Sequence, residues 1–191
     1  MKTNMHIIEC YALSCGLRID RPILEEEEIE LPSSKYITFH GDCSKGNTRS
    51  YEHWGGILDE IQDLGYKIIR VGNDDKAVLH ECLDDTYHMK TSLRQLAFLI
   101  KNSSLHLGYD SFPVHLASHF SKKIVAIYSL YASHSYPYWS DKKDIRLHEP
   151  DWKKYKPSFH YFEQTPIINT IEPTMVTSSV KELLAVKGSW P

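Results

Sequence analysis

The sequence predicts an α/β fold in which a Rossmann-like parallel sheet carries helices on both faces. Short apolar runs alternate with amphipathic segments of helical spacing between Lys35 and Tyr131, as they do in a series of βαβ units. The run Lys122–Leu130 is almost continuously apolar, which is typical of a strand buried on both of its faces. Because crossover connections between such strands are right-handed, we expect one parallel sheet.

The first elements of this region are two strands and three helices. We expect the strands at residues 35–40 and 66–72. The helix over 51–64 follows from apolar residues at helical spacing, and Gly65 ends it; these residues are Trp54, Ile57, Leu58, Ile61 and Leu64. A short helix is expected near 76–83. Ser92 can cap the third helix, whose apolar stripe is Leu93, Leu96, Ala97 and Ile100.

The remaining elements are two strands, two helices and a long connection. The strands are expected at 104–108 and 122–130, and Pro113 opens the helix between them at a position that tolerates proline. Residues 133–166 are rich in aromatic residues and proline, which favours a long packed loop that closes the edge of the core; a sugar-stacking or partner surface is the alternative. Residues 171–186 form the last amphipathic helix.

The first 34 residues form a separate unit, so the expected domains are 1–34 and 35–191. Residues 5–17 are apolar enough for a short helix, and residues 18–34 contain two prolines and four consecutive glutamates, Glu25–Glu28. Such a charge block is typical of an exposed linker, and recruitment of a basic partner is the alternative.

Composition excludes several classes of protein. A net charge of −3 and a pI near 6.4 provide no basic surface for nucleic acid. No apolar run approaches the length of a membrane span, and the amino terminus lacks the order of a signal peptide. The four cysteines are sparse and form no C-x-x-C pair, which favours free thiols in the cytoplasm over disulfides or zinc.

Three polar loops leave the carboxyl ends of predicted strands, where ligands bind to parallel sheets: residues 41–50, 72–75 and 108–112. The loop 108–112 opens a helix, whose first amides and dipole favour an anion; here the Ser111 hydroxyl and the amides of Ser111, Val114 and His115 are available. The loop 41–50 adds Ser44, Lys45, Thr48 and Arg49, which suit a phosphate. The two loops together predict a diphosphate site.

Lys35–Leu184 resembles the C-terminal, donor-binding half of the GT-B glycosyltransferases of the lipopolysaccharide heptosyltransferase family. The segment "HLGYDSFPVHLASHF" resembles the family's D-S-G-P-x-H region, "TRSYEHWGG" resembles its K-x-W-P region, and "IINTIEPTMVTSSVKELL" resembles its closing helix. The resemblance implies a nucleotide-diphosphate sugar donor such as ADP-heptose, no metal, and no cofactor besides that donor.

By position, the resemblance implies that Asp110 holds sugar hydroxyls, that the Ser111 region holds the diphosphate, and that Asp74 or Asp75 reaches the ribose. Arg49 replaces the family's phosphate-binding lysine, and Phe112 replaces a glycine. The candidate substrate-binding residues are Asp110, Ser111, Phe112, His115, Arg49, Ser44, Lys45, Thr48 and Asp74. The family's acceptor-binding domain, which supplies the catalytic base, has no counterpart here. The catalytic residues are therefore unknown, and we expect a homodimer or a partner chain to supply that domain.

Other interpretations of the 110–115 segment remain open. It is compatible with an ordinary strand–helix turn capped by an aspartate. His115 and His119 have a metal-ligand spacing but lack the glutamate of H-E-x-x-H, and a hydrolase would need the absent G-x-S-x-G elbow. A non-catalytic protein that retained the fold is the alternative to a glycosyltransferase.

Overall fold

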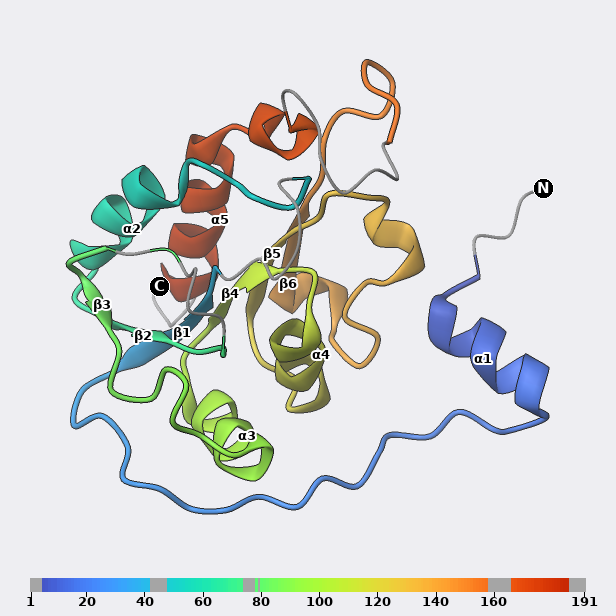
Figure 1. Ribbon diagram of the computed structural model, residues 1–191, viewed down its shortest axis with the longest axis horizontal. Coiled ribbons are helices and arrows are strands. Elements are labelled where there is room, and N and C mark those ends of the chain that lie inside the picture. Colours follow the sequence, from blue (N-terminus) through green and yellow to red (C-terminus); the bar gives the residue numbers. More distant parts are fainter. Residues whose placement is uncertain (1–4, 42–47, 74–77, 79, 158–165, 186–191) are drawn as a thin grey trace, which may run out of the picture.

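A computed structural model of the chain describes residues 5–41, 48–73, 78, 80–157 and 166–185. Within them, six parallel strands form one sheet in the order β3-β2-β1-β4-β5-β6 (Figure 1). The strands are β1 (Tyr36–His40), β2 (Lys67–Arg70), β3 (Leu83–Asp84), β4 (His106–Tyr109), β5 (Ile124–Ile127) and β6 (Ile145–His148). The predicted Rossmann-like parallel sheet is confirmed.

Helices cover both faces of the sheet. The helices α2 (Trp54–Gln62) and α5 (Pro173–Ala185) share one apolar core with Ile37 and Phe39 of β1. The helices α3 (Leu93–Asn102) and α4 (Phe112–His119) share the other core with Tyr36. Successive side chains of a strand point to opposite faces, so each buried strand contributes to both cores.

Most predicted elements are present, and Ser92 caps α3 in a capping box with Gln95. Two strands were missed. Leu83–Asp84 is strand β3, where a helix near 76–83 was expected; residues 74–77 and 79 lie outside the described residues. Strand β6 lies inside the segment 133–166, which was expected to be a loop, and it completes the sheet beside β5.

One residue of the predicted stripe on α3 is misplaced. Leu93, the first residue of the helix, is 69% exposed, whereas Leu96, Ala97 and Ile100 are buried, as predicted. Leu99 takes the remaining place in the core. The buried stripe therefore begins one turn later than predicted, at Leu96.

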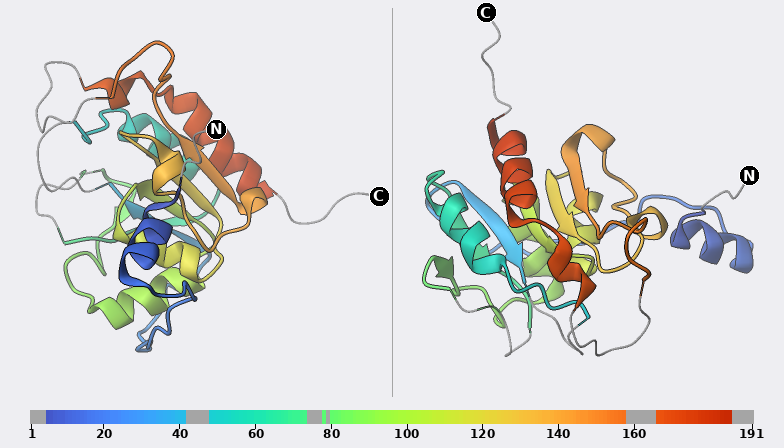
Figure 2. Two further views of the ribbon diagram at one scale, coloured as in Figure 1. Left: turned by 90° about the vertical axis from the view of Figure 1, so that its right-hand side faces the viewer. Right: turned by 90° about the horizontal axis from the view of Figure 1, so that it is seen from above.

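The first helix, α1 (Ile7–Cys15), is present as predicted and lies at the side of the molecule (Figures 1 and 2). The extended segment after it contains the glutamate block, which does not project freely. Glu26 binds Lys101 at 2.9 Å, and Glu27 accepts a hydrogen bond from Gln95 at 2.7 Å. The acidic block therefore attaches this segment to α3. No helix in the described ranges is long and apolar enough to cross a membrane.

Candidate functional site

The candidate site lies at the carboxyl ends of the central strands β1 and β4. The two strands pair in parallel, with His40 opposite Gly108. A Cβ atom on Gly108 would lie 2.6 Å from the carbonyl oxygen of His40, so only glycine allows the backbones to approach this closely. The turn Asp110–Ser111 thus follows β4 directly beside the end of β1.

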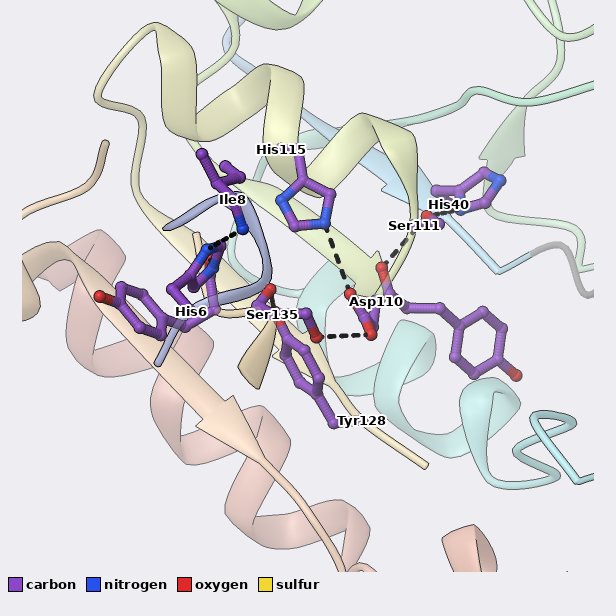
Figure 3. Close-up of polar contacts among 10 residues, drawn as sticks. His6, Ile8, His40, Asp110, Ser111, His115, Tyr128 and Ser135 are labelled. Carbon is purple, nitrogen blue, oxygen red and sulfur yellow. Dashed lines mark hydrogen bonds and ion pairs between the residues drawn. The ribbon is translucent and has the colours of Figure 1, made fainter. Parts of the chain in front are cut away.

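Ser111 joins this turn to β1 and starts α4. Its backbone is extended, and its side chain caps no amide of the helix. Instead, Oγ donates to the Tyr109 carbonyl at 3.2 Å and lies 2.9 Å from His40 Nδ1 (Figure 3). The Ser111 hydroxyl is thus within hydrogen-bond distance of both groups, and the tautomer of His40 decides whether Nδ1 accepts from Oγ or donates to it. The Val114 amide, which was expected to face a ligand, donates to the Ser111 carbonyl at 3.1 Å.

Both carboxylate oxygens of Asp110 have protein partners. Oδ2 accepts a hydrogen bond from Ser135 Oγ at 3.0 Å, and Oδ1 lies 3.5 Å from Nε2 of His115, one turn into α4. Figure 3 shows the carboxylate between these two side chains. The Asp110 side chain remains 26% exposed and that of His115 38% exposed, so the pair is accessible to a ligand.

The end of the first loop reaches the same edge of the sheet. The Tyr51 amide donates to the Tyr109 hydroxyl at 2.7 Å, and Trp54 Nε1 donates to the same oxygen at 2.8 Å. Tyr109 immediately precedes Asp110, so this contact brings the loop end to the turn. Arg49 lies two residues before Tyr51 and is exposed. Thr48 is half-buried, whereas Ser44, Lys45 and Asp74 lie outside the described residues.

Phe112 occupies the first position of α4. Its side chain is 52% exposed, so the ring lies on the surface next to Ser111 rather than in the core.

His6, the residue before α1, was not predicted and lies close to this site. It is buried, its Nδ1 accepts from the Ile8 amide at 3.1 Å, and its Nε2 lies 2.9 Å from the Tyr136 carbonyl oxygen. Burial lowers the pKa of His6, and the positive form of His115 acts in the same direction, while the Tyr136 carbonyl, Glu9 and Asp110 oppose this effect.

The structure brings together Asp110, Ser111 and His115 as the sequence predicted, but it adds partners that the sequence did not indicate. Ser111 contacts His40 and the Tyr109 carbonyl, and Asp110 contacts Ser135. His6 contacts Tyr136, the neighbour of Ser135. The position of His40 at the carboxyl end of the first strand was a usable signal, whereas Ser135 lies in a segment without periodicity. Among the described residues, no three His, Cys, Asp or Glu side chains meet in a metal-ligand group; His115 pairs with Asp110, and His119 packs against Phe120.

The parallel Rossmann-like sheet, with a polar turn at the carboxyl ends of its central strands, is the architecture of one half of a GT-B glycosyltransferase. The family model of glycosyltransferase family 9 (heptosyltransferase) matches residues 12–161. The chain belongs to this family, as its motifs indicated. No curated protein matches the chain.

Solved structures share the fold. A family 9 glycosyltransferase from Veillonella parvula has a TM-score of 0.62 and 17% identity over 82% of this chain and 48% of its own. The ADP-heptose lipopolysaccharide heptosyltransferase II of E. coli has a TM-score of 0.57 and 18% identity over 91% and 50%. The dodecameric iron-containing heptosyltransferase TibC, in complex with ADP-D-β-D-heptose, has a TM-score of 0.61 and 16% identity over 88% and 51%. The chain thus spans about half the length of these structures.

Proposed function

We propose that this chain is the donor-binding part of a glycosyltransferase that transfers a sugar from a nucleotide-diphosphate sugar, such as ADP-heptose, to a glycan or lipopolysaccharide-type acceptor. The observation that carries the proposal is the turn Asp110–Ser111, which presents an accessible carboxylate at the start of α4 beside the end of β1. Ligands of α/β sheets bind at such carboxyl ends, and a helix start favours the charge of a diphosphate.

In this proposal different residues bind the sugar and the diphosphate of the donor. Asp110 binds sugar hydroxyls, while Ser111 and the first turn of α4 face the diphosphate and His115 orients Asp110. Arg49 supplies a cation, because it is exposed and enters no ion pair with another described residue. Ser44, Lys45, Thr48 and Asp74 complete the phosphate and ribose contacts. The donor is the substrate, and no resident cofactor or metal takes part.

The acceptor-binding region and the catalytic base come from another domain, supplied by a partner chain or a second copy of this chain. Exposed apolar side chains on α1 support this proposal, since Tyr11 is 67% exposed and Leu13 is 68% exposed. Apolar surface of this kind is characteristic of protein interfaces. The described cysteines, Cys10, Cys15 and Cys82, are free, which supports a cytoplasmic location.

A non-catalytic protein that retained the fold is the second candidate, and Phe112 is the observation that favours it. An exposed ring next to Ser111 is able to obstruct a diphosphate that would otherwise approach the α4 amides. Replacing Phe112 by glycine therefore discriminates between the two functions.

The test is a thermal-shift titration with ADP and ADP-heptose on the wild type, Arg49→Ala and Phe112→Gly. A ligand that binds only the folded state raises the Tm. We expect Arg49→Ala to weaken binding by roughly 1.5–3 kcal/mol, the range for a hydrogen bond to a charged group. If Phe112 obstructs the site, Phe112→Gly strengthens binding; if the ring stacks on the donor, Phe112→Gly weakens it. Absence of any shift in both the wild type and Phe112→Gly would refute donor binding and leave the non-catalytic function.

A further inference from the structure

A continuous set of contacts leads from α1 to the Asp110 carboxylate. His6 Nε2 contacts the Tyr136 carbonyl at 2.9 Å, across 130 positions of the sequence. Tyr136 adjoins Ser135, whose Oγ donates to Asp110 Oδ2 at 3.0 Å. Figure 3 shows His6, Ser135 and Asp110 close together. They come from the N-cap of α1, the C-cap of the 3₁₀ helix Ala132–His134 and the turn after β4.

The first contact has a defined direction. Nδ1 of His6 accepts from the Ile8 amide, so a neutral His6 carries its proton on Nε2 and donates it to the Tyr136 carbonyl. The His6 ring also packs edge-on against the Tyr136 ring, with centroids 4.5 Å apart. Tyr138 donates to Glu9 of α1 at 3.3 Å. The start of α1 is therefore bound to the segment 136–138 by polar and aromatic contacts.

The linker after α1 binds the same segment. Arg21 donates to the Trp139 carbonyl at 3.3 Å and lies over the Trp139 ring at 5.7 Å. None of the residues of α1 itself is buried. The attachment of α1 thus depends on contacts to residues 136–139 rather than on a shared apolar core.

Ser135 is fixed by its backbone as well as by its hydroxyl. Its amide donates to the Ala132 carbonyl at 3.2 Å, and its carbonyl accepts from the Tyr128 hydroxyl at 3.3 Å. The hydroxyl is then directed at Oδ2 of Asp110, while His115 faces Oδ1. Loss of the Ser135 hydroxyl would leave the carboxylate with one partner and free to rotate.

We propose that Ser135 is a positioning residue for Asp110, and that docked α1, through His6, holds the Ser135–Tyr136 turn in the geometry that lets Asp110 bind the sugar of the donor. This inference rests on the proposed function, in which Asp110 contacts the sugar and the start of α4 contacts the diphosphate. It extends that function by coupling the sugar end of the site to the position of α1. A partner that covers or displaces α1 would then change sugar binding without touching the sugar.

The test compares ADP-heptose with ADP by calorimetry on the full chain. Ser135→Ala is expected to weaken ADP-heptose binding roughly 3- to 10-fold, about the effect of one hydrogen bond, and to leave ADP binding unchanged. Ser135→Thr, which keeps the hydroxyl, restores the affinity. Ser133→Ala is the matched control, because Ser133 is exposed in the same 3₁₀ turn. Equal losses for ADP and ADP-heptose in Ser135→Ala would overturn the positioning role.

The role of α1 is tested with His6→Ala. We expect the same selective loss for ADP-heptose, and no further loss when His6→Ala is added to Ser135→Ala, since coupled residues are not additive. Hydrogen exchange provides a readout without ligand: His6→Ala raises exchange at the amides of 135–139 and leaves α4 unchanged. Unchanged exchange at 135–139 would overturn the role of α1. A wild type that binds neither ADP nor ADP-heptose would instead contradict the proposed donor function.

Discussion

The helices α1 and α5, at opposite ends of the described chain, are attached to the body in different ways. In α5, Val176, Val180 and Leu183 are buried in the core that lies under β1, β4 and β5. In α1 no residue is buried, and the contacts come from His6 at its N-cap and from Glu9. Helix α5 is therefore part of the apolar core, whereas α1 is attached through its first turn.

The difference shows that the spacing of apolar residues matters more than their number. The apolar residues of α5 recur at i, i+4 and i+7, which gathers them on one face of the helix. Those of α1 are more frequent, as "IIECYALSC" shows, but they are distributed around the helix. A helix of that pattern has no single face for the sheet, so its first turn provides its attachment and its remaining surface is available to a partner.

The largest effect should come from removing a leucine from each helix. Leu183 is 3% exposed and Leu13 is 68% exposed. We expect Leu183→Ala to lower the free energy of unfolding by about 2–5 kcal/mol, the range for a buried leucine, and Leu13→Ala to change it by less than about 0.5 kcal/mol. Urea denaturation measures both. If Leu13→Ala instead lowers the free energy of unfolding by about 1–2 kcal/mol or more, the size of effect expected at a buried position, then α1 packs against the rest of the fold.

Most of the fold was predictable because its signals are local and periodic. Trp54, Ile57 and Leu58 of α2 are buried at the positions that their spacing predicted. Three of the four residues predicted on α3, Leu96, Ala97 and Ile100, are buried as well. Strand β3 has two residues, which is too short for any period to be visible. Strand β6 shows a period of two, since Ile145 and Leu147 pack on the core, but this short alternation lies inside a segment dominated by aromatic residues.

Only the part of the candidate site that is contiguous in the sequence was predictable. Asp110, Ser111 and His115 belong to one strand–turn–helix segment, and the preference of ligands for strand ends identifies that segment. Ser135 joins Asp110 from 25 positions away, and His6 contacts Tyr136 from 130 positions away. Such contacts depend on tertiary packing and leave no pattern in the sequence. The positions of Ser44, Lys45 and Asp74 remain predictions.

A second, smaller loss of stability should occur at low pH, because two histidines of the sheet, His106 and His148, resist protonation in the folded protein. Burial lowers the pKa of His106 from 6.5 to about 3, and burial also lowers the pKa of His148, whose Nε2 lies 3.0 Å from Ser179 of α5. Below pH 6.5 the unfolded chain therefore binds more protons than the folded chain, and stability falls as the pH is lowered. At pH 5, His106 alone should cost about 2 kcal/mol relative to pH 7.

The acid effect is assigned by two variants in urea denaturation at pH 7 and pH 5. His106 Nδ1 lies 3.0 Å from Thr38 Oγ1. His106→Leu removes this hydrogen bond together with the titrating group, so the difference in stability between the two pH values should shrink. Thr38→Val removes the hydrogen bond alone, so the difference should persist. An unchanged difference in His106→Leu would assign the acid sensitivity to other groups.

The smallest effect should come from two matched capping residues. Glu9 and Gln95 each occupy the third helical position and accept a hydrogen bond from the N-cap amide, at 2.9 Å in both α1 and α3. Gln95→Ala removes this cap together with the exposed hydrogen bond to Glu27. It should lower the free energy of unfolding by roughly 0.5–1 kcal/mol, about the effect of a lost cap, because α3 belongs to a buried core and unfolds with it. Glu9→Ala removes an equivalent cap, together with the Tyr138 contact, from a helix without buried residues. It should therefore leave global unfolding unchanged and raise hydrogen exchange at the amides of α1. Equal losses of global stability in the two variants would show that α1 unfolds with the body, and its attachment would then be cooperative rather than confined to its first turn.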